Sequence, residues 1–493
     1  MAFEQVQAKE GLKSEGSLRS GFTSTIFKTR YIRFYRSYLP VWMLFLCLTE
    51  VIVVGVALCT AFAIFSEFGV AGWMLTGEFI EKKVLFFTLV MFVIMVAMGL
   101  YQRRLREGSA GIALRVMVSH ILAFLLLYII YSIFPQIAIR EDVILVSMVF
   151  SSTGVLFARL VFLRFFGTEF FKRRVLVLGS GKRAAGITCL RRWIDQVGYR
   201  IIGFIHIDGD NDQIDEDRIV RLNGEKLTDY VSRKCIDEIV VAFDDRRRRI
   251  SMDDLLDCKM QGIHVIDLLD FYERETFKLK LDIMDPSWLI FSDGFKKNIT
   301  YKIAKRLFDI TVSAIILLFA LPFMLITAIA VLIESGLPIF YTQTRIGEAG
   351  KKFRVMKFRS MVVNAEKNGA QWASKNDSRV TRVGAFIRLT RLDELPQLIN
   401  VLRGDMSFVG PRPERPEFVA QFEERIPYYA ERHRVKPGIT GWAQVCYPYG
   451  ASEEDAMEKL QYDLYYAKNY SIFLDFMILL QTAEVIIWQK GAR

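Results

Sequence analysis

The chain is poor in the residues from which metal centres and disulfide frameworks are built. Its 493 residues include only six cysteines and four histidines. No two cysteines have the spacing of a zinc or redox motif, and the histidines do not pair into a metal motif. The cysteines are therefore expected to be free thiols, in a reducing compartment or in lipid. A cleavable signal peptide is not expected either, because the first 40 residues are polar and basic.

Apolar and basic side chains, by contrast, are abundant. Hydrophobic residues make up 52% of the chain and charged residues 24%, and the formal net charge is +11. This combination indicates membrane spans joined to soluble domains, and the length is enough for two or three domains. The positive charge suits nucleic acid, anionic lipid or phosphorylated substrates. The basic residues lie mostly beside apolar runs, which favours a lipid bilayer as the partner and argues against nucleic acid.

Four apolar stretches follow one another after the first 40 residues, at 41–65, 84–102, 116–139 and 143–163. Each is long enough to cross a hydrocarbon core of about 30 Å. They predict a four-helix transmembrane domain over residues 41–166 rather than the buried helices of a soluble protein. Glu50 lies inside the first stretch, where it marks either a functional group or a contact with a neighbouring helix. The sequence does not decide its role.

The loop charges predict how these spans are oriented. Basic residues precede the first span, separate the second from the third, and follow the fourth, whereas the other two loops are short and more acidic. The positive-inside rule therefore places the N-terminal segment 1–40 and everything after about residue 170 in the cytoplasm. The basic residues are Lys28, Arg30, Arg33, Arg36, Arg103, Arg104, Arg106, Arg115, Lys172, Arg173 and Arg174.

Residues 172–290 have the pattern of a separate α/β domain. A strand candidate at 174–181 runs into a glycine turn, and further candidates at 199–207, 237–243 and 263–267 alternate with helical segments. Alternating strands and helices of this kind predict a small Rossmann-like, doubly wound domain with a parallel sheet.

The glycine turn of this domain matches the G-x-G-x-x-A form of a dinucleotide fingerprint. Its positions are Gly179, Gly181 and Ala184, with Asp208 at the end of the second strand candidate. Such a fingerprint is weak by itself, so a degenerate regulatory or scaffolding domain is preferred and bound NAD(P) is not expected. A membrane-anchored nucleotide-sugar dehydratase would need that cofactor. The Tyr-x-x-x-Lys spacings required by its chemistry are expected by chance among 19 tyrosines.

Residues 310–333 form an uncharged run of 24 residues with Pro322 near its centre. The run is long enough to span a membrane, but basic residues flank it on both sides, at 296–306 and at 345–359. A single span cannot leave both flanks in the cytoplasm. A helix bent at Leu321 and Pro322 could enter the bilayer and return, because proline removes a backbone hydrogen bond and hinges a helix. We therefore predict a re-entrant helix.

Two adjacent carboxylates, Asp393 and Glu394, stand shortly before Pro396. Proline is tolerated in the first turn of a helix, so a helix is expected to start at about 393–395. The pair would then lie at a helix N-terminus, where free amides and the helix dipole favour phosphate. The plainer interpretation is an ordinary N-cap with an acidic first turn, and this segment alone leaves both interpretations open.

Several ordered motifs surround this pair. They are RLFD before the apolar run, KFRSM, LDELPQLINVLRGDMSFVGPRP, KPGITGWAQV and YDLYYAKN. With these motifs, residues 301–493 resemble the bacterial sugar transferase family, the polyprenyl-phosphate hexose-1-phosphate transferases. The four spans and the Rossmann-like module resemble the large members of that family. The expected protein is thus a membrane protein, α plus α/β, with a mostly helical catalytic domain over 301–493 that contains the re-entrant helix.

The resemblance implies an activity. A hexose-1-phosphate would pass from a UDP-sugar to undecaprenyl phosphate with release of UMP, as the first membrane step of exopolysaccharide, O-antigen or capsule synthesis. Asp393 would be the nucleophile of a covalent phospho-sugar intermediate, and Glu394, together with Asp393, would support Mg²⁺. The catalytic domain would lie on the cytoplasmic face of the bacterial inner membrane. A homodimer is compatible with this picture, and downstream glycosyltransferases would extend the product.

The cations near the pair suit that chemistry. Carboxylates can attack phosphoryl centres covalently, and Mg²⁺ needs only one or two protein carboxylates beside a diphosphate. Arg412, held between two prolines, is suited to bidentate phosphate contact. Arg388, Arg359 and Lys357 are further phosphate candidates, or else cations of the membrane interface.

Two other functions stay open on the sequence. One is the NAD-dependent nucleotide-sugar dehydratase, carried by the middle domain. The other is a non-catalytic scaffold for polysaccharide assembly. The sequence does not say which hexose is transferred.

Overall fold

The computed structural model describes residues 31–34, 37–65, 77–101, 109–166, 172–188, 198–207, 210–244, 252–295, 299–363, 365, 377–447, 450 and 452–487. The chain divides into two compact units, the first made of Met1–Phe92 and His120–Gly167 and the second of Val93–Ser119 and Thr168–Arg493. Asp208 and most of the basic loop residues named above lie outside the described residues.

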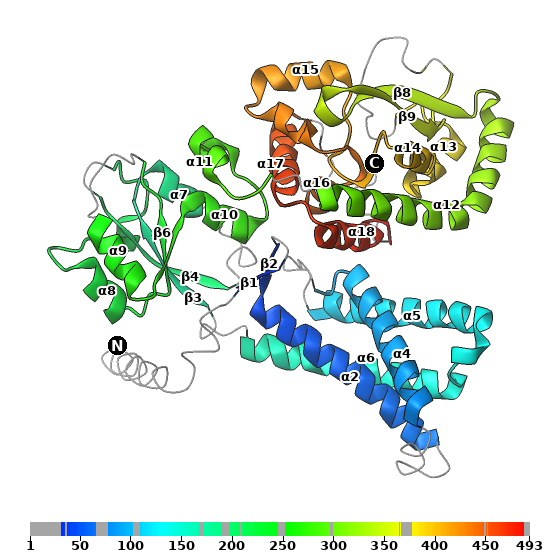
Figure 1. Cartoon of the computed structure of the whole chain (residues 1–493), viewed down its shortest axis with the longest axis horizontal. Helices are drawn as coiled ribbons and strands as arrows, with labels where there is room; N and C mark the ends of the chain where they lie inside the picture. Colours follow the sequence, from blue (N-terminus) through cyan, green and yellow to red (C-terminus); the bar gives the residue numbers. More distant parts are fainter. Residues whose placement is uncertain are drawn as a thin grey trace. The chain divides into compact units, whose positions relative to one another are not determined.

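Long apolar helices dominate the N-terminal part (Figure 1). A short antiparallel hairpin of β1 (Tyr31–Phe34) and β2 (Ser37–Pro40) leads into α2 (Val41–Phe65), α4 (Gly77–Ala97), α5 (Ser109–Ile133) and α6 (Glu141–Phe166). Over the described residues, the helices long and apolar enough to cross a membrane are α2, α5, α6 and the C-terminal α12 (Ile299–Ser335). This confirms a membrane protein with four candidate membrane helices.

The predicted spans differ from these helices in detail. The predicted span 84–102 corresponds to α4, which is helical but carries Glu81, Lys82 and Lys83 in its first turns and is not in that set. The third span, predicted at 116–139, is shifted towards the N-terminus as α5, because Pro135 starts a separate 3₁₀ turn, η1 (Pro135–Ile137). Charged turns and proline therefore decide where these helices start and stop.

Glu50 makes a buried ion pair between two of these helices. Its two carboxylate oxygens meet Nε and Nη2 of Arg159 of α6 at 2.8 and 2.9 Å, and the residues are 0% and 4% exposed. Gly154 of α6 lies against Val53 of α2, so closely that a Cβ there would come within 2.6 Å of a Val53 methyl group. Polar pairs and small residues are what hold helices together in lipid. Glu50 therefore faces a neighbouring helix, one of the two roles that the sequence left open.

The middle part of the chain is a doubly wound α/β domain, as predicted. Its five parallel strands lie in the order β5-β4-β3-β6-β7, with β3 at the centre. Their bounds are β3 Arg173–Leu178, β4 Tyr199–Ile205, β5 Ile219–Val220, β6 Glu238–Val241 and β7 His264–Asp267. Separate buried clusters cover the two faces of the sheet, beneath α7 (Lys182–Thr188), α8 (Leu227–Arg233), α9 (Met252–Met260) and α10 (Leu268–Thr276). Burial on both faces explains the almost continuous apolar run of β3.

The segment after α10 belongs to the core of the C-terminal part. Leu279, Met284 and Trp288 are buried there, in the stretch that holds η4 (Leu281–Ile283) and α11 (Pro286–Phe291). The backbone N–H of Leu279 donates to the Gln461 carbonyl at 3.0 Å. The side chain of Lys468 reaches back to Glu273 of α10 at 2.6 Å. The hydrophobic core of the C-terminal part thus begins before residue 300.

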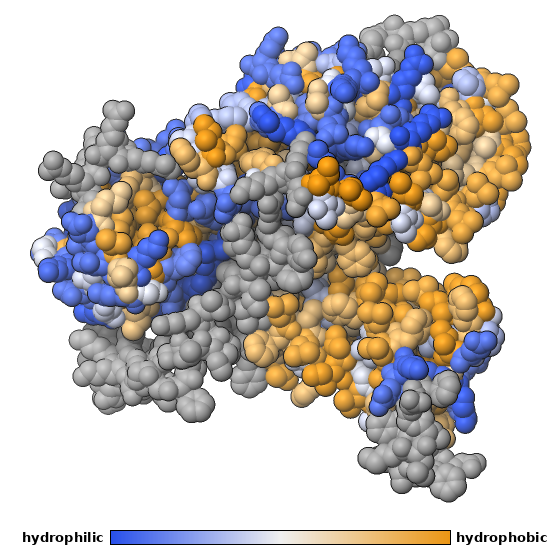
Figure 2. Space-filling view, viewed as in Figure 1, coloured by the Kyte–Doolittle hydropathy of each residue, from blue (hydrophilic) through white to orange (hydrophobic). Residues whose placement is uncertain are grey.

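Helix α12 contains Pro322 and changes direction along its length (Figure 1). A straight helix of 37 residues would extend about 55 Å, yet both ends of α12 are tied to neighbouring elements of one domain. Arg306 donates to the carbonyls of Val401 and Leu402 at the end of α14 (2.6 and 2.7 Å). At the other end, Arg359 donates to the Ser335 carbonyl at 2.6 Å. Figure 2 shows the apolar surface gathered over this helix.

The remaining elements build the domain that α12 joins. The hairpin β8 (Phe340–Ile346) and β9 (Lys352–Phe358) is antiparallel, and β10 (Ser407–Val409) pairs in parallel with β11 (Gly438–Thr440). The helices are α13 (Arg382–Leu389), η6 (Leu392–Glu394), α14 (Gln397–Arg403), α15 (Pro416–Arg425), η7 (Tyr429–Arg434), α16 (Trp442–Cys446), α17 (Glu453–Asn469) and α18 (Ile472–Ile487). Helices α17 and α18 contribute buried residues, among them Leu464, Tyr466 and Ile478, to the core that also contains Phe408 and Val409 of β10.

Candidate active site

The two adjacent carboxylates lie in a tight turn between two helices. Helix α13 is capped by Thr381, whose hydroxyl accepts from the Gly384 N–H at 2.9 Å. After α13, Arg391 takes a left-handed conformation with φ of 61°. The 3₁₀ turn η6 (Leu392–Glu394) follows and holds both carboxylates.

The predicted helix start at 393–395 is wrong. Helix α14 begins at Gln397, and Pro396 is its N-cap rather than a residue of its first turn. The N–H groups of Glu394 and Leu395 bond to the carbonyls of Arg391 and Leu392, both at 3.2 Å, so they close η6 instead. The pair therefore lies before α14, and the chemistry of the site depends on side chains rather than on a helix terminus.

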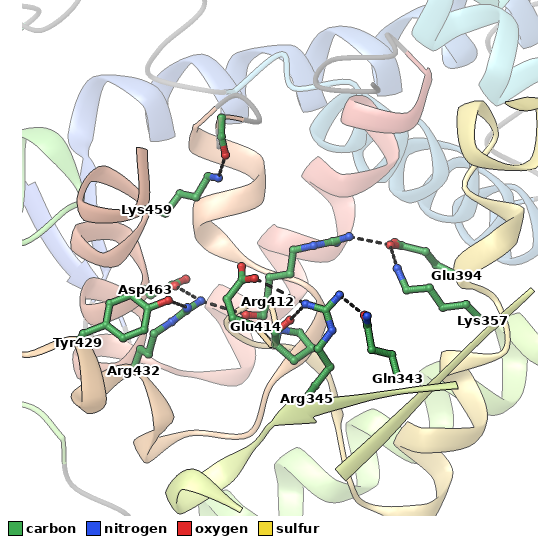
Figure 3. A network of polar contacts seen from close by, with 12 residues as sticks. Gln343, Arg345, Lys357, Glu394, Arg412, Glu414, Tyr429, Arg432, Lys459 and Asp463 are labelled. Atoms are coloured by element: carbon green, nitrogen blue, oxygen red, sulfur yellow. Dashed lines mark hydrogen bonds and ion pairs between the residues drawn. The ribbon is translucent and has the colours of Figure 1, made fainter. Parts of the chain in front are cut away.

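Glu394 is held by two cations from different elements. Lys357 Nζ of β9 and Arg412 Nη2, from the turn after β10, both contact Glu394 Oε1, at 2.8 and 2.9 Å (Figure 3). Burial raises the pKa of Glu394, but Arg412 and Lys357 outweigh it and hold that pKa well below its usual range. Glu394 is thus a fixed negative charge, and the two predicted phosphate ligands converge on it.

Asp393 has a different environment although it is the next residue. It is 8% exposed, and its carboxylate has no hydrogen bond or ion pair with any other residue that the structure describes. Burial and the nearby Glu394 raise the pKa of Asp393 to about 6, against the opposing effects of Lys357, Arg388 and Arg391. An uncommitted, partly desolvated carboxylate is what a nucleophile at a phosphoryl centre requires.

The turn that carries Arg412 is fixed through its backbone. The carbonyls of its four residues Pro411 to Glu414 accept hydrogen bonds from Gly438 N, Arg432 Nη2, Arg345 Nη1 and Ile346 N, at 2.9 to 3.1 Å. With every carbonyl bonded and a proline on each side, the backbone at Arg412 has little freedom to move. Figure 3 shows Arg345 and Arg432 on opposite sides of this turn.

Glycines allow the strands beneath this turn to approach closely. A Cβ on Gly438 would come within 2.1 Å of the backbone nitrogen of Gly410 and 2.4 Å of the Thr440 carbonyl oxygen. A Cβ on Gly410 would come within 2.2 Å of the Lys436 carbonyl oxygen. Gly438 of the KPGITGW motif and Gly410 are therefore required by backbone packing behind Arg412.

The other predicted residues lie elsewhere. Arg359 is 6% exposed and donates to the carbonyls of Ser335 and Gly336, both at 2.6 Å, so it caps the end of α12 rather than contacting the two carboxylates. Arg388, in the last turn of α13, lies near enough to lower the pKa of Asp393. Leu321 and Pro322 lie within α12. The structure thus brings Lys357 and Arg412 to the site, with Arg388 nearby.

The glycine turn of the middle domain already has anionic partners. Backbone N–H groups of Lys182 and Arg183 donate to the Asp244 carboxylate, both at 2.8 Å, and that of Ser180 donates to Asp210 at 3.2 Å. A Cβ on Gly181 would come within 2.1 Å of Asp244. In a dinucleotide enzyme such amides face the pyrophosphate. In this turn the carboxylates of Asp210 and Asp244 accept from those amides.

Sequence reasoning missed the residues that support the site from behind. Arg432 pairs with Asp463 of α17 at 2.7 Å, and both are buried. Lys305 contacts Asp309 (3.2 Å) and Asp475 (2.9 Å) and donates to the Val409 carbonyl just before the turn. A charged residue within the mostly apolar helix α18 was the available signal for Asp475. No signal separated Arg432 from Arg434, the exposed arginine in the same ERHR run.

Comparison with known proteins adds to this geometry. The family model described as "Bacterial sugar transferase" matches residues 300–489. The chain is 43% identical over 236 residues to the UDP-N-acetylgalactosamine-undecaprenyl-phosphate N-acetylgalactosaminephosphotransferase of Aeromonas hydrophila, covering 48% of this chain and 55% of that protein. It is 36% identical over 323 residues to the UDP-glucose:undecaprenyl-phosphate glucose-1-phosphate transferase of Klebsiella pneumoniae, covering 63% of this chain and 67% of that protein.

A protein of the same name from Xanthomonas campestris pv. campestris is 43% identical over 202 residues, which is 40% of this chain and 42% of that protein. The chain thus spans about half the length of the Aeromonas and Xanthomonas relatives that it matches. The match to the Klebsiella protein reaches well beyond the C-terminal domain. By its motifs and by these relatives, the chain belongs to the bacterial sugar transferase family.

Proposed function

We propose that this protein transfers a hexose-1-phosphate from a UDP-sugar to undecaprenyl phosphate. The observation that carries the proposal is the division of labour between Asp393 and Glu394. One carboxylate is uncommitted with a raised pKa, and its neighbour is fixed as an anion by two cations. Environments that push two adjacent pKa values apart assign different chemical roles to the two groups. The names of the relatives supply the substrate class.

The reaction has two steps. An Asp393 oxygen attacks the β-phosphorus of the UDP-sugar, and the bond from that phosphorus to the bridging oxygen breaks, so that UMP leaves with the electron pair. The product is a sugar phosphate bound covalently to Asp393. An oxygen of undecaprenyl phosphate then attacks the same phosphorus and frees the carboxylate. The lipid-linked sugar diphosphate is the product, and no group is oxidised or reduced.

The residues at the site also fit a magnesium ion. Over the described residues no cluster of three or more metal-ligating side chains exists, but Mg²⁺ commonly takes only one or two carboxylates and completes its shell with water and substrate phosphate. Asp393 and the second oxygen of Glu394 would hold it, since Glu394 Oε1 is occupied by Lys357 and Arg412. When bound, it would neutralise charge on the donor diphosphate.

We further propose that α12 enters and leaves the bilayer on one side. Its apolar residues, internal proline, change of direction and doubly anchored ends support this arrangement. With the basic flanks in the cytoplasm, the catalytic domain would lie on the cytoplasmic face of the bacterial inner membrane. Reporters fused after Lys172 and after the C-terminal Arg493 should both report a cytoplasmic location. An external reporter at Arg493 with an internal one at Lys172 would refute the re-entrant helix.

The amides of the middle domain's glycine turn are bonded to Asp244 and Asp210, which argues against the dehydratase alternative. Membranes containing the protein should release UMP when given one member of a panel of UDP-sugars together with undecaprenyl phosphate. Asp393→Asn should abolish this release. Asp405→Asn, at an exposed position in the same segment, is the matched control and should retain it. Full activity in Asp393→Asn would remove Asp393 from the nucleophile role, and intact polysaccharide in an Asp393→Ala, Glu394→Ala strain would instead indicate a scaffold.

A further inference from the structure

Arg432 is a buried cation that takes no part in the proposed reaction but is hydrogen-bonded to a residue of the site, Arg412. It lies in η7 and is 6% exposed. Its Nη2 donates to the Arg412 carbonyl at 3.0 Å and pairs with Asp463 at 2.7 Å, while its Nη1 donates to the Tyr429 hydroxyl at 2.7 Å. The three acceptors come from three different segments of the domain (Figure 3).

Only an arginine fits this arrangement. The guanidinium is a rigid planar fork that can serve several acceptors at once, whereas a lysine ammonium is a single point charge. The guanidinium also lies 5.1 Å from the centre of the Tyr429 ring. Asp463 is 2% exposed, so it is the buried countercharge that keeps the Arg432 cation in place. Arg432 is therefore held in one orientation by Tyr429 and Asp463.

The remaining acceptor, the carbonyl of Arg412, connects Arg432 to the site. Arg432 bonds the main-chain carbonyl of the same residue, Arg412, whose side chain meets Glu394 at 2.9 Å. The direction in which the Arg412 side chain leaves the backbone depends on how its peptide unit is turned. The flanking prolines fix φ at their own positions, and the hydrogen bond from Arg432 fixes the carbonyl between them.

We propose that Arg432 and Asp463 are positioning residues, which hold Arg412 in the orientation that places its guanidinium on Glu394 and beside the donor diphosphate. This inference rests on the proposed function. It assigns α17, which carries Asp463, a part in catalysis at a distance from the reacting atoms. A buried ion pair could also serve stability alone, because removing one partner leaves an uncompensated charge. The two roles give different results in a double-mutant cycle.

The cycle combines Arg432→Lys with Arg412→Ala in the full-length protein in detergent, with radiolabelled UDP-sugar and undecaprenyl phosphate. Arg432→Lys alone should lower kcat/KM by roughly 10-fold to 100-fold, as expected when a charged group at a site moves by about 1 Å. In the Arg412→Ala background the same change should have little further effect, because the side chain that Arg432 positions is already absent. Asp463→Asn should behave like Arg432→Lys, with a smaller loss.

The matched control is another arginine–carboxylate pair of the same domain. Arg425 and Glu453 contact each other at 3.1 Å on the surface, so Arg425→Lys should leave both kcat/KM and the unfolding temperature unchanged. Long incubations keep the residual activity of Arg412→Ala measurable, and Arg412→Lys serves as a second background.

Three outcomes are decisive. A loss caused by Arg432→Lys that persists undiminished in both Arg412 backgrounds overturns the positioning role and leaves a structural one. An unchanged kcat/KM in Arg432→Lys also overturns it. Absence of transfer by the wild-type protein would refute the proposed function instead, and is distinguished from the other two because it needs no variant.

Discussion

Replacing Lys357 with methionine should move the acid side of the transferase's pH profile to higher pH. Asp393 must be ionised to attack phosphorus. Burial raises the pKa of Asp393 to about 6, and Lys357 opposes that rise. In the wild-type protein, kcat/KM should therefore increase with pH through about 6 and then level off, because a free-enzyme pKa appears in kcat/KM. Without the Lys357 charge the pKa of Asp393 rises further, so the activity is lost at a higher pH.

The size of the change follows from the site. Lys357 contacts Glu394, the neighbour of Asp393, at 2.8 Å. A nearby opposite charge is worth about 1 to 3 pKa units, and we take the lower end because Arg388 and Arg391 remain. A shift from about 6 to about 7 lowers the ionised fraction at pH 6 from about one half to about one tenth, a roughly fivefold loss. At about pH 8 the same shift costs almost nothing.

The assay should follow the first half-reaction, UMP release without lipid acceptor, because a lipid monophosphate itself titrates near pH 6. Lys352→Met, at an exposed position on the same strand, is the matched control and should leave the profile in place. A wild-type profile that stays flat down to about pH 5 would refute the assignment of Asp393, since its pKa could not then be raised. An acid limb that does not move in Lys357→Met would refute the role given to Lys357.

Three further predictions concern backbone packing, the membrane helices and the metal. Gly438→Ala should destabilise the domain by about 1 to 3 kcal/mol and lower transfer, because a Cβ would meet the backbone of Gly410; Gly55→Ala, where a Cβ would lie 3.7 Å from its nearest neighbour, the Thr88 hydroxyl oxygen, should be tolerated, and thermal unfolding in detergent compares them. Glu50→Leu should destabilise the helices by about 3 to 5 kcal/mol by removing the carboxylate of the buried pair with Arg159, whereas Glu50→Leu with Arg159→Leu should recover most of that loss; equal instability of the two variants would contradict the pairing. Chelation with EDTA should stop UMP release and added Mg²⁺ should restore it; release that is insensitive to EDTA would argue against the metal.

Local patterns in the sequence were enough to predict the parallel sheet and the first membrane helix. The apolar run Val175 to Leu178 of β3 and the alternation that follows it predicted the parallel sheet, because a strand buried on both faces is mostly apolar. The first span was predicted at the bounds that α2 has, 41–65. The helix at Pro396 was misplaced because proline can be an N-cap as well as a first-turn residue, and the competing 3₁₀ turn depends on the left-handed Arg391.

The candidate site was predictable only in its local part. Asp393 and Glu394 are adjacent in sequence, and the prolines around Arg412 marked it as pre-organised. Which cations reach Glu394 depends on contacts across many residues, such as the 37 that separate Lys357 from it. The role of Arg432 was equally unpredictable from the sequence. Arg434, two residues away, is also an arginine, yet its side chain is 64% exposed. Pairings of this kind are set by tertiary packing and have no local signature.

Mass spectrometry of the peptide that contains Asp393 tests the central claim most directly. The purified protein is incubated with Mg²⁺ and the UDP-sugar that supports UMP release, in the absence of lipid acceptor, and is then digested. We predict one equivalent of UMP and a peptide heavier by one sugar phosphate, with the modification on Asp393 and lost on addition of undecaprenyl phosphate. An unmodified peptide, with UMP released only when the lipid acceptor is present, would contradict a covalent intermediate on Asp393.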